Sequence, residues 1–149
     1  MSIKAHKMQY ISNQPILNVG IQPIAFAAKY YEQYKNVYHD CFYEMRKALN
    51  LQPYNCCDFI DECLKQNIFL LTQSDKLIGA VSICCNEIDD LIVSKAYQRK
   101  GYGKQLLHFA INHLLRKNRV PILHVADWNR AAMALYKNNG FIITKTYEC

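Results

Sequence analysis

Apolar residues recur at helical spacing in the first third of the chain and at strand spacing in the second half. Over residues 28–49 they return every three or four positions, which predicts one helix or two consecutive helices. Pro53 ends this stretch, and residues 58–66 are expected to form another short helix. The apolar positions of the first stretch are Tyr31, Tyr34, Val37, Tyr38, Cys41, Phe42, Met45 and Leu49.

The segment before these helices has only weak strand signals. Residues 9–12 are expected to form one strand, and residues 16–24 contain a second apolar stretch. Pro15 and Pro23 limit both to short or edge strands, because proline cannot donate to a sheet ladder.

From residue 68 onward the pattern predicts a meander followed by β-α-β-α-β. Residues 68–72 and 77–85 form a hairpin around a Ser74-Asp75 turn, and Gly140 is placed to end the last helix in the left-handed conformation. The chain is therefore a mixed α/β domain. The remaining predicted elements are a strand at 87–93, a helix at 104–116, a strand at 121–125, a helix at 129–138 and a strand at 141–146.

Length and composition predict one domain over residues 1–149. Hydrophobic residues make up 51% of the chain and charged residues 20%, with 5 Gly and 4 Pro, which excludes a disordered or collagen-like chain. The longest apolar run, residues 77–85, is about half of a membrane span, and no apolar segment follows the N-terminal lysines. We expect a cytoplasmic protein without a membrane partner.

The charged residues, cysteines and histidines indicate which kinds of ligand to expect. The formal net charge of +6 favours an anionic ligand. Seven cysteines occur without any C-x-x-C spacing, and the histidines show no ligand spacing with a carboxylate or thiol. We therefore expect free thiols and no metal.

Residues 91–104 carry the strongest chemical signal. An apolar strand leads into a loop with Gly101 and Gly103, and an amphipathic helix follows. Consecutive amides in such a loop can bind phosphate at the helix N-terminus, and Arg99, Lys100 and Lys104 add positive charge. Taken alone, the loop is better explained as a turn with a solvated basic face, because neither G-x-G-x-x-G nor G-K-[ST] is present.

Two segments in register resemble one known family. Residues 98–103, Q-R-K-G-Y-G, resemble the Q/R-x-x-G-x-G/A motif of the GNAT superfamily of acetyl-CoA-dependent N-acetyltransferases. About 25 residues later, residues 129–141 resemble the family's N-x-x-A-x-x-x-Y-x-x-x-G-F segment. The resemblance covers residues 68–146 as the acetyl-CoA half and leaves residues 1–67 as the variable acceptor half. It implies a mostly antiparallel mixed sheet with helices on both faces.

The resemblance also implies roles for individual residues. Backbone amides from Arg99 through Lys104 would hold the pyrophosphate of coenzyme A, and the amide of Val93 would bond the thioester oxygen. Asn129 would bond the pantetheine arm, and Tyr136 would protonate the departing thiolate, unless it is only a helix core residue. The implied cofactor-binding set is Leu91, Ile92, Val93, Gln98, Arg99, Lys100, Gly101, Tyr102, Gly103, Lys104, Asn129, Ala132 and Tyr136.

The catalytic base is expected to be Glu87. It lies eleven residues before Gln98, where family members that use a glutamate have theirs. Strand alternation puts Asp89 on the same face and Asp90 on the opposite face. The alternative is that Glu87 is a turn carboxylate and the amine loses its proton to water.

Acceptor-binding candidates lie on the first helices. They are Tyr31, Tyr38, Phe42 and Arg46. The aromatic residues would line either the core or the acceptor pocket. Arg46 would pair with an acceptor carboxylate or with Asp58 or Glu62.

These expectations combine into an N-acetyltransferase that moves an acetyl group from acetyl-CoA to a primary amine, on a small molecule or peptide, by direct attack in a ternary complex. A non-catalytic acyl-CoA-binding module is the alternative. A nucleic-acid partner is not expected, since only Tyr97 and Tyr102 lie near the basic residues for base stacking. Those basic residues are Lys95, Arg99, Lys100, Lys104, Arg116, Lys117 and Arg119.

The C-terminal end of the sheet departs from the family. The chain has room for one strand after Gly140-Phe141, where members often have two. An open sheet edge invites pairing. We expect residues 8–12 or a second subunit of a homodimer to cover it.

Overall fold

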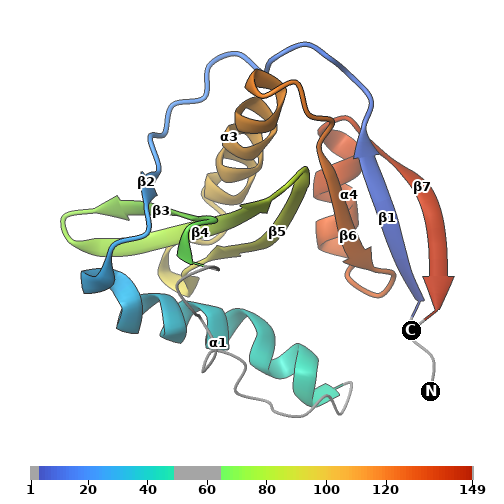
Figure 1. Cartoon of the computed structure of the whole chain (residues 1–149). Helices are drawn as coiled ribbons and strands as arrows, with labels where there is room; N and C mark the ends of the chain where they lie inside the picture. The colour runs from blue at the N-terminus through green and yellow to red at the C-terminus, as the bar shows by residue number, and fades with distance from the viewer. Residues whose placement is uncertain (1–3, 49–64, 149) are drawn as a thin grey trace.

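The computed structural model describes residues 4–48 and 65–148. In this part of the chain one seven-stranded sheet has the order β2-β3-β4-β5-β6-β1-β7, with helices on both faces (Figure 1). The predicted mixed α/β class is confirmed. The strands are β1 (Lys4–Tyr10), β2 (Ile24–Ala25), β3 (Ile68–Gln73), β4 (Lys76–Cys84), β5 (Glu87–Val93), β6 (Ile122–Ala126) and β7 (Phe141–Glu148). The helices are the 3-10 turns η1 (Ala28–Tyr30) and η2 (Lys95–Tyr97) and the α-helices α1 (Tyr31–Ala48), α3 (Tyr102–Arg116) and α4 (Arg130–Asn138).

Most of the sheet is antiparallel, and its turns use positive-φ residues. Ser74 and Asp75 have φ values of 50° and 61°, which suit the tight turn between β3 and β4. Gly140 has a φ of 92° after α4, as predicted. The pair β5 and β6 is parallel and is joined by the crossover helix α3.

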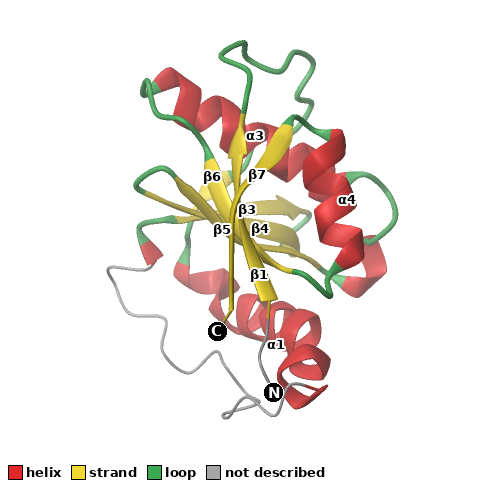
Figure 2. Ribbon diagram, turned by 90° about the vertical axis from the view of Figure 1, so that its right-hand side faces the viewer, coloured by secondary structure: helices red, strands yellow, loops and turns green. Residues whose placement is uncertain are grey.

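Two apolar clusters lie on opposite faces of the sheet. On one face α3 packs through Leu106, Leu107 and Ile111, whose side chains are fully buried. On the other face α1 packs through Tyr34 and Val37. Figure 2 shows α1 and α3 on opposite sides of the sheet. Both helices contact β4 and β5, one helix on each face of the sheet.

The N-terminal strand differs most from the sequence-based expectation. A strand was expected at residues 9–12, and residues 8–12 or a second subunit were expected to cover the sheet edge. Instead β1 spans Lys4–Tyr10, lies between β6 and β7 and is antiparallel to both, so that β7 is the edge. Met8 is completely buried there. The polar sequence K-A-H-K-M-Q-Y hides this strand, because its pairing partners are more than 100 residues away.

Residues 16–24 form less strand than expected. Only Ile24 belongs to β2, and residue 16 is held in a loop instead. The backbone amide of Ile16 donates to Asn112 Oδ1, and Asn112 Nδ2 donates to the Ile16 carbonyl, both at 2.8 Å. The loop therefore satisfies its backbone groups on α3 rather than on a strand. The short helix expected at residues 58–66 lies mostly outside the described residues.

Replacing Met8 by alanine tests whether β1 is part of the core. We expect the Met8→Ala variant to lose about 2–5 kcal/mol of unfolding free energy, because a fully buried side chain leaves a cavity. Gln9→Ala, on the opposite face of the strand, is the control and should cost less than about 1 kcal/mol. Urea unfolding of both variants measures the difference. Equal effects would contradict an inner position for this strand.

Candidate active site

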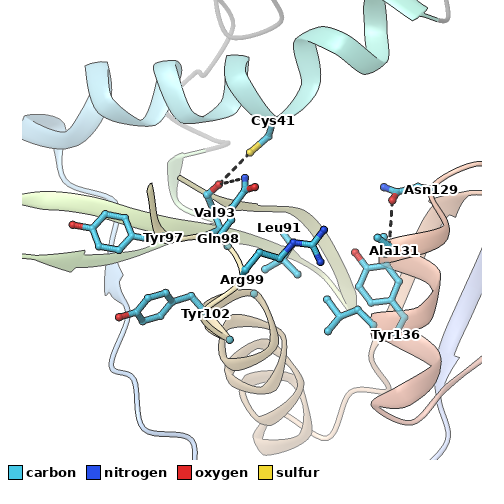
Figure 3. A pocket seen from close by; sticks show the side chains of 14 residues that line it. Cys41, Leu91, Val93, Tyr97, Gln98, Arg99, Tyr102, Asn129, Ala131 and Tyr136 are labelled. Atoms are coloured by element: carbon cyan, nitrogen blue, oxygen red, sulfur yellow. Dashed lines mark hydrogen bonds between the residues drawn. The ribbon is translucent and has the colours of Figure 1, made fainter. Parts of the chain in front are cut away.

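A cavity opens where β5 and β6 separate. Among the described residues these two strands are paired only at Glu87 and Ile122, near their N-terminal ends. Beyond that pair lies a cavity of about 390 Å³ (Figure 3). Its described lining comes from β5, η2 and the loop after it, the first residues of α3, helix α4 with its cap, and Cys41 of α1. The lining residues are Cys41, Leu91, Val93, Tyr97, Gln98, Arg99, Gly101, Tyr102, Gly103, Asn129, Ala131, Ala132, Leu135 and Tyr136.

The backbone of Val93 faces this cavity. The Ser94 amide donates to the Ile78 carbonyl at 2.8 Å, so the alternation of an antiparallel pair turns the Val93 amide and carbonyl away from β4. The Val93 carbonyl accepts from Gln98 Nε2 at 2.9 Å and from Cys41 Sγ at 3.5 Å. These two bonds tie the end of β5 to the loop that follows and to α1.

The N-terminus of α3 forms one end of the cavity. Arg99 and Gly101 have positive φ values of 65° and 88°, which turn the loop tightly into the helix. The first helical amide to bond back is that of Gln105, which donates to the Gly101 carbonyl at 3.1 Å. The preceding first-turn amides, of Tyr102, Gly103 and Lys104, have no partner further back in the helix. This geometry suits an anion such as phosphate.

Helix α4 forms the opposite wall. Asn129 caps it, and its Oδ1 accepts from the Ala132 amide at 3.2 Å. One turn later Tyr136 lines the cavity and packs its ring against Phe141, at 6.1 Å between centroids. Burial, and secondarily the charge of Asp89, raises the pKa of Tyr136 to about 12. The phenol therefore keeps its proton throughout the physiological pH range.

Asp90 lies at a bulge in β5. Ile92 pairs with Ala80 but Asp89 pairs with Ser82, so β5 has one extra residue, and Asp90 has a φ of 44°. Strand alternation alone predicted that Asp90 faces away from Asp89. The structure corrects this expectation, because Asp90 faces α1, where Tyr38 Oη donates to its Oδ1 at 3.5 Å.

The environment of Asp90 disfavours its ionised form. Burial is the largest cause, and the charges of Asp89 and then Glu87 act in the same direction, while the hydrogen bond from Tyr38 opposes them. Together they raise the pKa of Asp90 to about 7. A carboxyl group with this pKa is half-ionised at neutral pH.

Glu87, the base expected from the sequence, lies at the other end of β5. Its Oε1 accepts from His124 Nδ1 at 2.6 Å, and both side chains are more than one third exposed. The pair is next to Ile122, where β5 and β6 are still joined. The structure therefore separates Glu87 from the N-terminus of α3 by the length of the strand.

Most of the predicted cofactor-binding residues come together at the cavity. Three of the set do not line it: Ile92 is 1% exposed and packs under α1, while Lys100 and Lys104 are exposed outside it. Sequence reasoning missed four lining residues, Cys41, Tyr97, Ala131 and Leu135. Leu135 and Tyr136 are adjacent in α4 and pack against the same apolar cluster. Its place beside Tyr136 was the sequence signal that could have identified Leu135 as a lining residue.

Three of the predicted acceptor residues, Tyr31, Tyr38 and Phe42, do not line the cavity. Tyr38 and Phe42 pack against each other at 4.7 Å in the α1 cluster, and Tyr31 packs against Phe26 at 6.3 Å. The side chain of Arg46 lies outside the described residues. Cys41, one turn after Tyr38, is the α1 residue that reaches the cavity.

The described residues give no sign of a metal site. Within residues 4–48 and 65–148, no three His, Cys, Asp or Glu side chains form a group that could hold a metal ion. The cysteines in these ranges, Cys41, Cys84 and Cys85, are free thiols. No helix in the described part of the chain is long and apolar enough to cross a membrane.

Comparison with known proteins gives the family. The family model for GNAT acetyltransferases matches residues 28–141, which is more than half of the chain. The chain belongs to the GNAT acetyltransferase family. The match includes α1, the loop before α3, α4 and Gly140-Phe141, so the resemblance of the two sequence motifs is confirmed.

Solved GNAT structures have the same fold at low sequence identity. A GNAT acetyltransferase from Colwellia psychrerythraea matches with a TM-score of 0.73 at 14% identity, over 99% of this chain and 55% of that one. A GCN5-related N-acetyltransferase from Sphaerobacter thermophilus matches with a TM-score of 0.63 at 16% identity, over 98% and 50%. This GNAT chain therefore spans about half the length of these two neighbours.

A third neighbour was solved with its ligands. The diaminobutyrate acetyltransferase EctA from Paenibacillus lautus, in complex with L-2,4-diaminobutyric acid and coenzyme A, matches with a TM-score of 0.53 at 14% identity. The match covers 80% of this chain and 75% of that one. It adds a ligand-bound example of the shared fold.

The Asp90 carboxyl should make stability depend on pH. Its pKa is about 7 in the folded protein and near its ordinary value of 3.8 when unfolded, so the folded state binds more protons between these values. Stability therefore falls as pH rises through this window. We expect Asp90→Asn to gain roughly 2–4 kcal/mol relative to the wild type between pH 4 and pH 8. Urea unfolding at several pH values measures it, and a difference that does not change with pH would contradict the buried carboxyl.

Proposed function

We propose that this GNAT protein transfers an acetyl group from acetyl-CoA to a primary amine by direct attack in a ternary complex. The observation that carries the proposal is the separation of β5 from β6 beyond Glu87 and Ile122. It leaves the backbone of Val93 facing a cavity that has helix N-terminal amides at one end and a protonated tyrosine on the opposite wall. A thioester with a phosphate-bearing tail needs these three features.

The residues at the cavity fit the parts of acetyl-CoA in order. The first-turn amides of α3 and the Gly101 turn suit the pyrophosphate, with Arg99 beside them. The extended pantetheine arm would lie along the free edge of β5 and meet Asn129 at the start of α4. Acetyl-CoA supplies an activated acetyl group, and the protein residues bind and orient it.

The proposed chemistry needs two proton transfers. The amine nitrogen attacks the thioester carbonyl carbon, the carbon–sulfur bond breaks, and the sulfur receives a proton from Tyr136 Oη while the amine gives one to a base. The Val93 amide stabilises the oxygen as negative charge develops on it. Because burial keeps Tyr136 protonated to about pH 12, its proton is available at any physiological pH.

The acceptor would enter from the α1 side. Asp90 lies on that side, and the charge of its carboxylate suits a cationic amine. The EctA neighbour was solved with an amine substrate, L-2,4-diaminobutyric acid. We therefore include it among the test acceptors together with lysine, spermidine, glucosamine and a peptide with a free N-terminus.

Calorimetry with acetyl-CoA and a thiol-release assay over these amines test the proposal. We expect binding, and turnover of at least one amine. Tyr136→Phe should bind acetyl-CoA within about threefold of the wild type but turn over about a hundredfold more slowly, as for loss of a general acid. Binding without turnover of any amine would instead favour a non-catalytic acyl-CoA-binding module.

Tyr97→Phe is the matched control for that variant. Tyr97 lines the same cavity near the start of α3, with its ring 6.1 Å from that of Tyr102. Loss of its hydroxyl should leave turnover within about threefold. A similar loss of turnover in both variants would argue against a proton-donating role for Tyr136.

The two loop glycines should respond differently to alanine. Gly101 has a φ of 88° with no atom within 4 Å of an added Cβ, so Gly101→Ala adds about 1–2 kcal/mol of backbone strain alone. An added Cβ at Gly103 would meet Val93 Cγ2 at an ordinary 3.8 Å. We expect Gly101→Ala to bind acetyl-CoA about tenfold more weakly and Gly103→Ala to bind it within about threefold. Calorimetry on both variants measures these affinities. A lower affinity of Gly103→Ala than of Gly101→Ala for acetyl-CoA would contradict the loop geometry.

A further inference from the structure

We propose that Asp90, rather than Glu87, is the catalytic base that takes the proton from the acceptor amine. The inference rests on the acetyl transfer proposed above and names the residue that this step lacks. It is carried by the position of Asp90 at the β5 bulge, by the face it occupies and by its contact with α1.

Distance along the strand favours Asp90. A strand rises about 3.3 Å per residue, so Asp90 lies roughly 10 Å from Val93 along the backbone and Glu87 roughly 20 Å. The attacking nitrogen must come within about 3–3.5 Å of the thioester carbonyl, next to the Val93 amide. A base has to reach that nitrogen directly or through one water. The Asp90 side chain can span the remaining distance in this way, and the Glu87 side chain cannot.

The bulge turns Asp90 toward the side from which an acceptor would enter. Tyr38 of α1 contacts the Asp90 carboxylate, and Cys41, the next turn of the same helix, lines the cavity and contacts the Val93 carbonyl. One turn of α1 therefore bridges Asp90 and the proposed reaction centre. Without the extra residue in β5, strand alternation would put this carboxylate on the α3 face.

The two carboxylates also differ in their partners. Glu87 is held by His124 at 2.6 Å in an exposed pair. Among the described residues, the groups that act on Asp90 are Asp89 and Glu87 from β5 and Tyr38 from α1, and none of these three is a cation. An acceptor ammonium would supply the missing positive charge. Its nitrogen would then pass one proton to Asp90, giving a neutral amine and a neutral carboxylic acid. After this amine attacks the thioester, its nitrogen loses a second proton, which replaces the proton that Tyr136 gives to sulfur.

The environment suits this exchange. Because Asp90 has a pKa of about 7, both its ionised and its protonated forms are accessible near neutral pH. General-base catalysis is most effective when the pKa of the base lies near the working pH. The carboxylate can therefore accept the proton from the amine and release it to water after the acetylated product leaves.

The test compares the pH dependence of turnover in four proteins. With an amine that the wild type acetylates, kcat/KM should rise with pH and level off above an inflection near pH 7. Asp90→Asn should lose that inflection and about a hundredfold in kcat at pH 7, while binding acetyl-CoA within about threefold. Tyr38→Phe removes a hydrogen bond that lowers the pKa of Asp90, so its inflection should move to higher pH.

Glu87→Gln is the rival variant. If Glu87 were the base, this protein would lose the inflection and Asp90→Asn would keep it, which would overturn the proposal. Hydroxylamine separates loss of a base from loss of structure, because it is neutral at pH 7 and has no ammonium proton to lose. Where the wild type acetylates it, Asp90→Asn should do so within about fivefold. A hundredfold loss there as well would assign Asp90 a structural role.

The proposed function fails in a different way from this inference. If the wild type binds acetyl-CoA but turns over none of the amines, acetyl transfer itself is overturned. If the wild type turns over an amine and Asp90→Asn retains the same rate and inflection, acetyl transfer stands and only the assignment of Asp90 is overturned.

Discussion

The structure of the site depends on how β5 and β6 are joined. Two parallel strands that paired along their full length would use the backbone donors and acceptors of both facing edges. Here the described residues pair only at Glu87 and Ile122, and the Ile122 amide donates to the Asn86 carbonyl at the same end. Beyond that point the cavity is lined by β5, the N-terminus of α3 and helix α4. Beyond that pair the edge of β5 is free of β6, and its residues Leu91 and Val93 line the cavity.

Burial of charge near this edge works against stability. Asp90 occupies a left-handed conformation in a strand, and the charges of Asp89 and Glu87 act against its ionised form; within residues 4–48 and 65–148 no cation offsets them. Each of these features costs free energy in the folded state. The apolar packing of α1 and α3 on the two sheet faces offsets that cost. Local violations of folding rules that neighbouring packing tolerates are typical of functional sites.

Local patterns in the sequence predicted the parts of the fold that depend on local interactions. The β3–β4 hairpin, α3, α4 and the left-handed Gly140 follow from spacing and turn residues, and the structure has them. The cavity wall contributed by α4 could be predicted because Asn129 and Tyr136 belong to one short motif. Local patterns could not predict the inner position of β1 or the face occupied by Asp90. The first depends on pairing over more than 100 residues, and the second on a one-residue bulge that reverses the alternation.

Strand β1, which the sequence did not predict in this position, also helps to hold the residues of the candidate site in place. His6 of β1 is 6% exposed; its Nε2 lies 2.7 Å from Asp127 Oδ1 and its Nδ1 lies 2.8 Å from Thr146 Oγ1. The Asp127 amide in turn donates to the Lys4 carbonyl at 2.8 Å. Asp127 begins the loop that leads to Asn129, so β1 holds this loop from behind while Asn129 caps α4 in front. The position of Asn129 at the cavity is thus set by the first strand of the chain as well as by the motif that contains it.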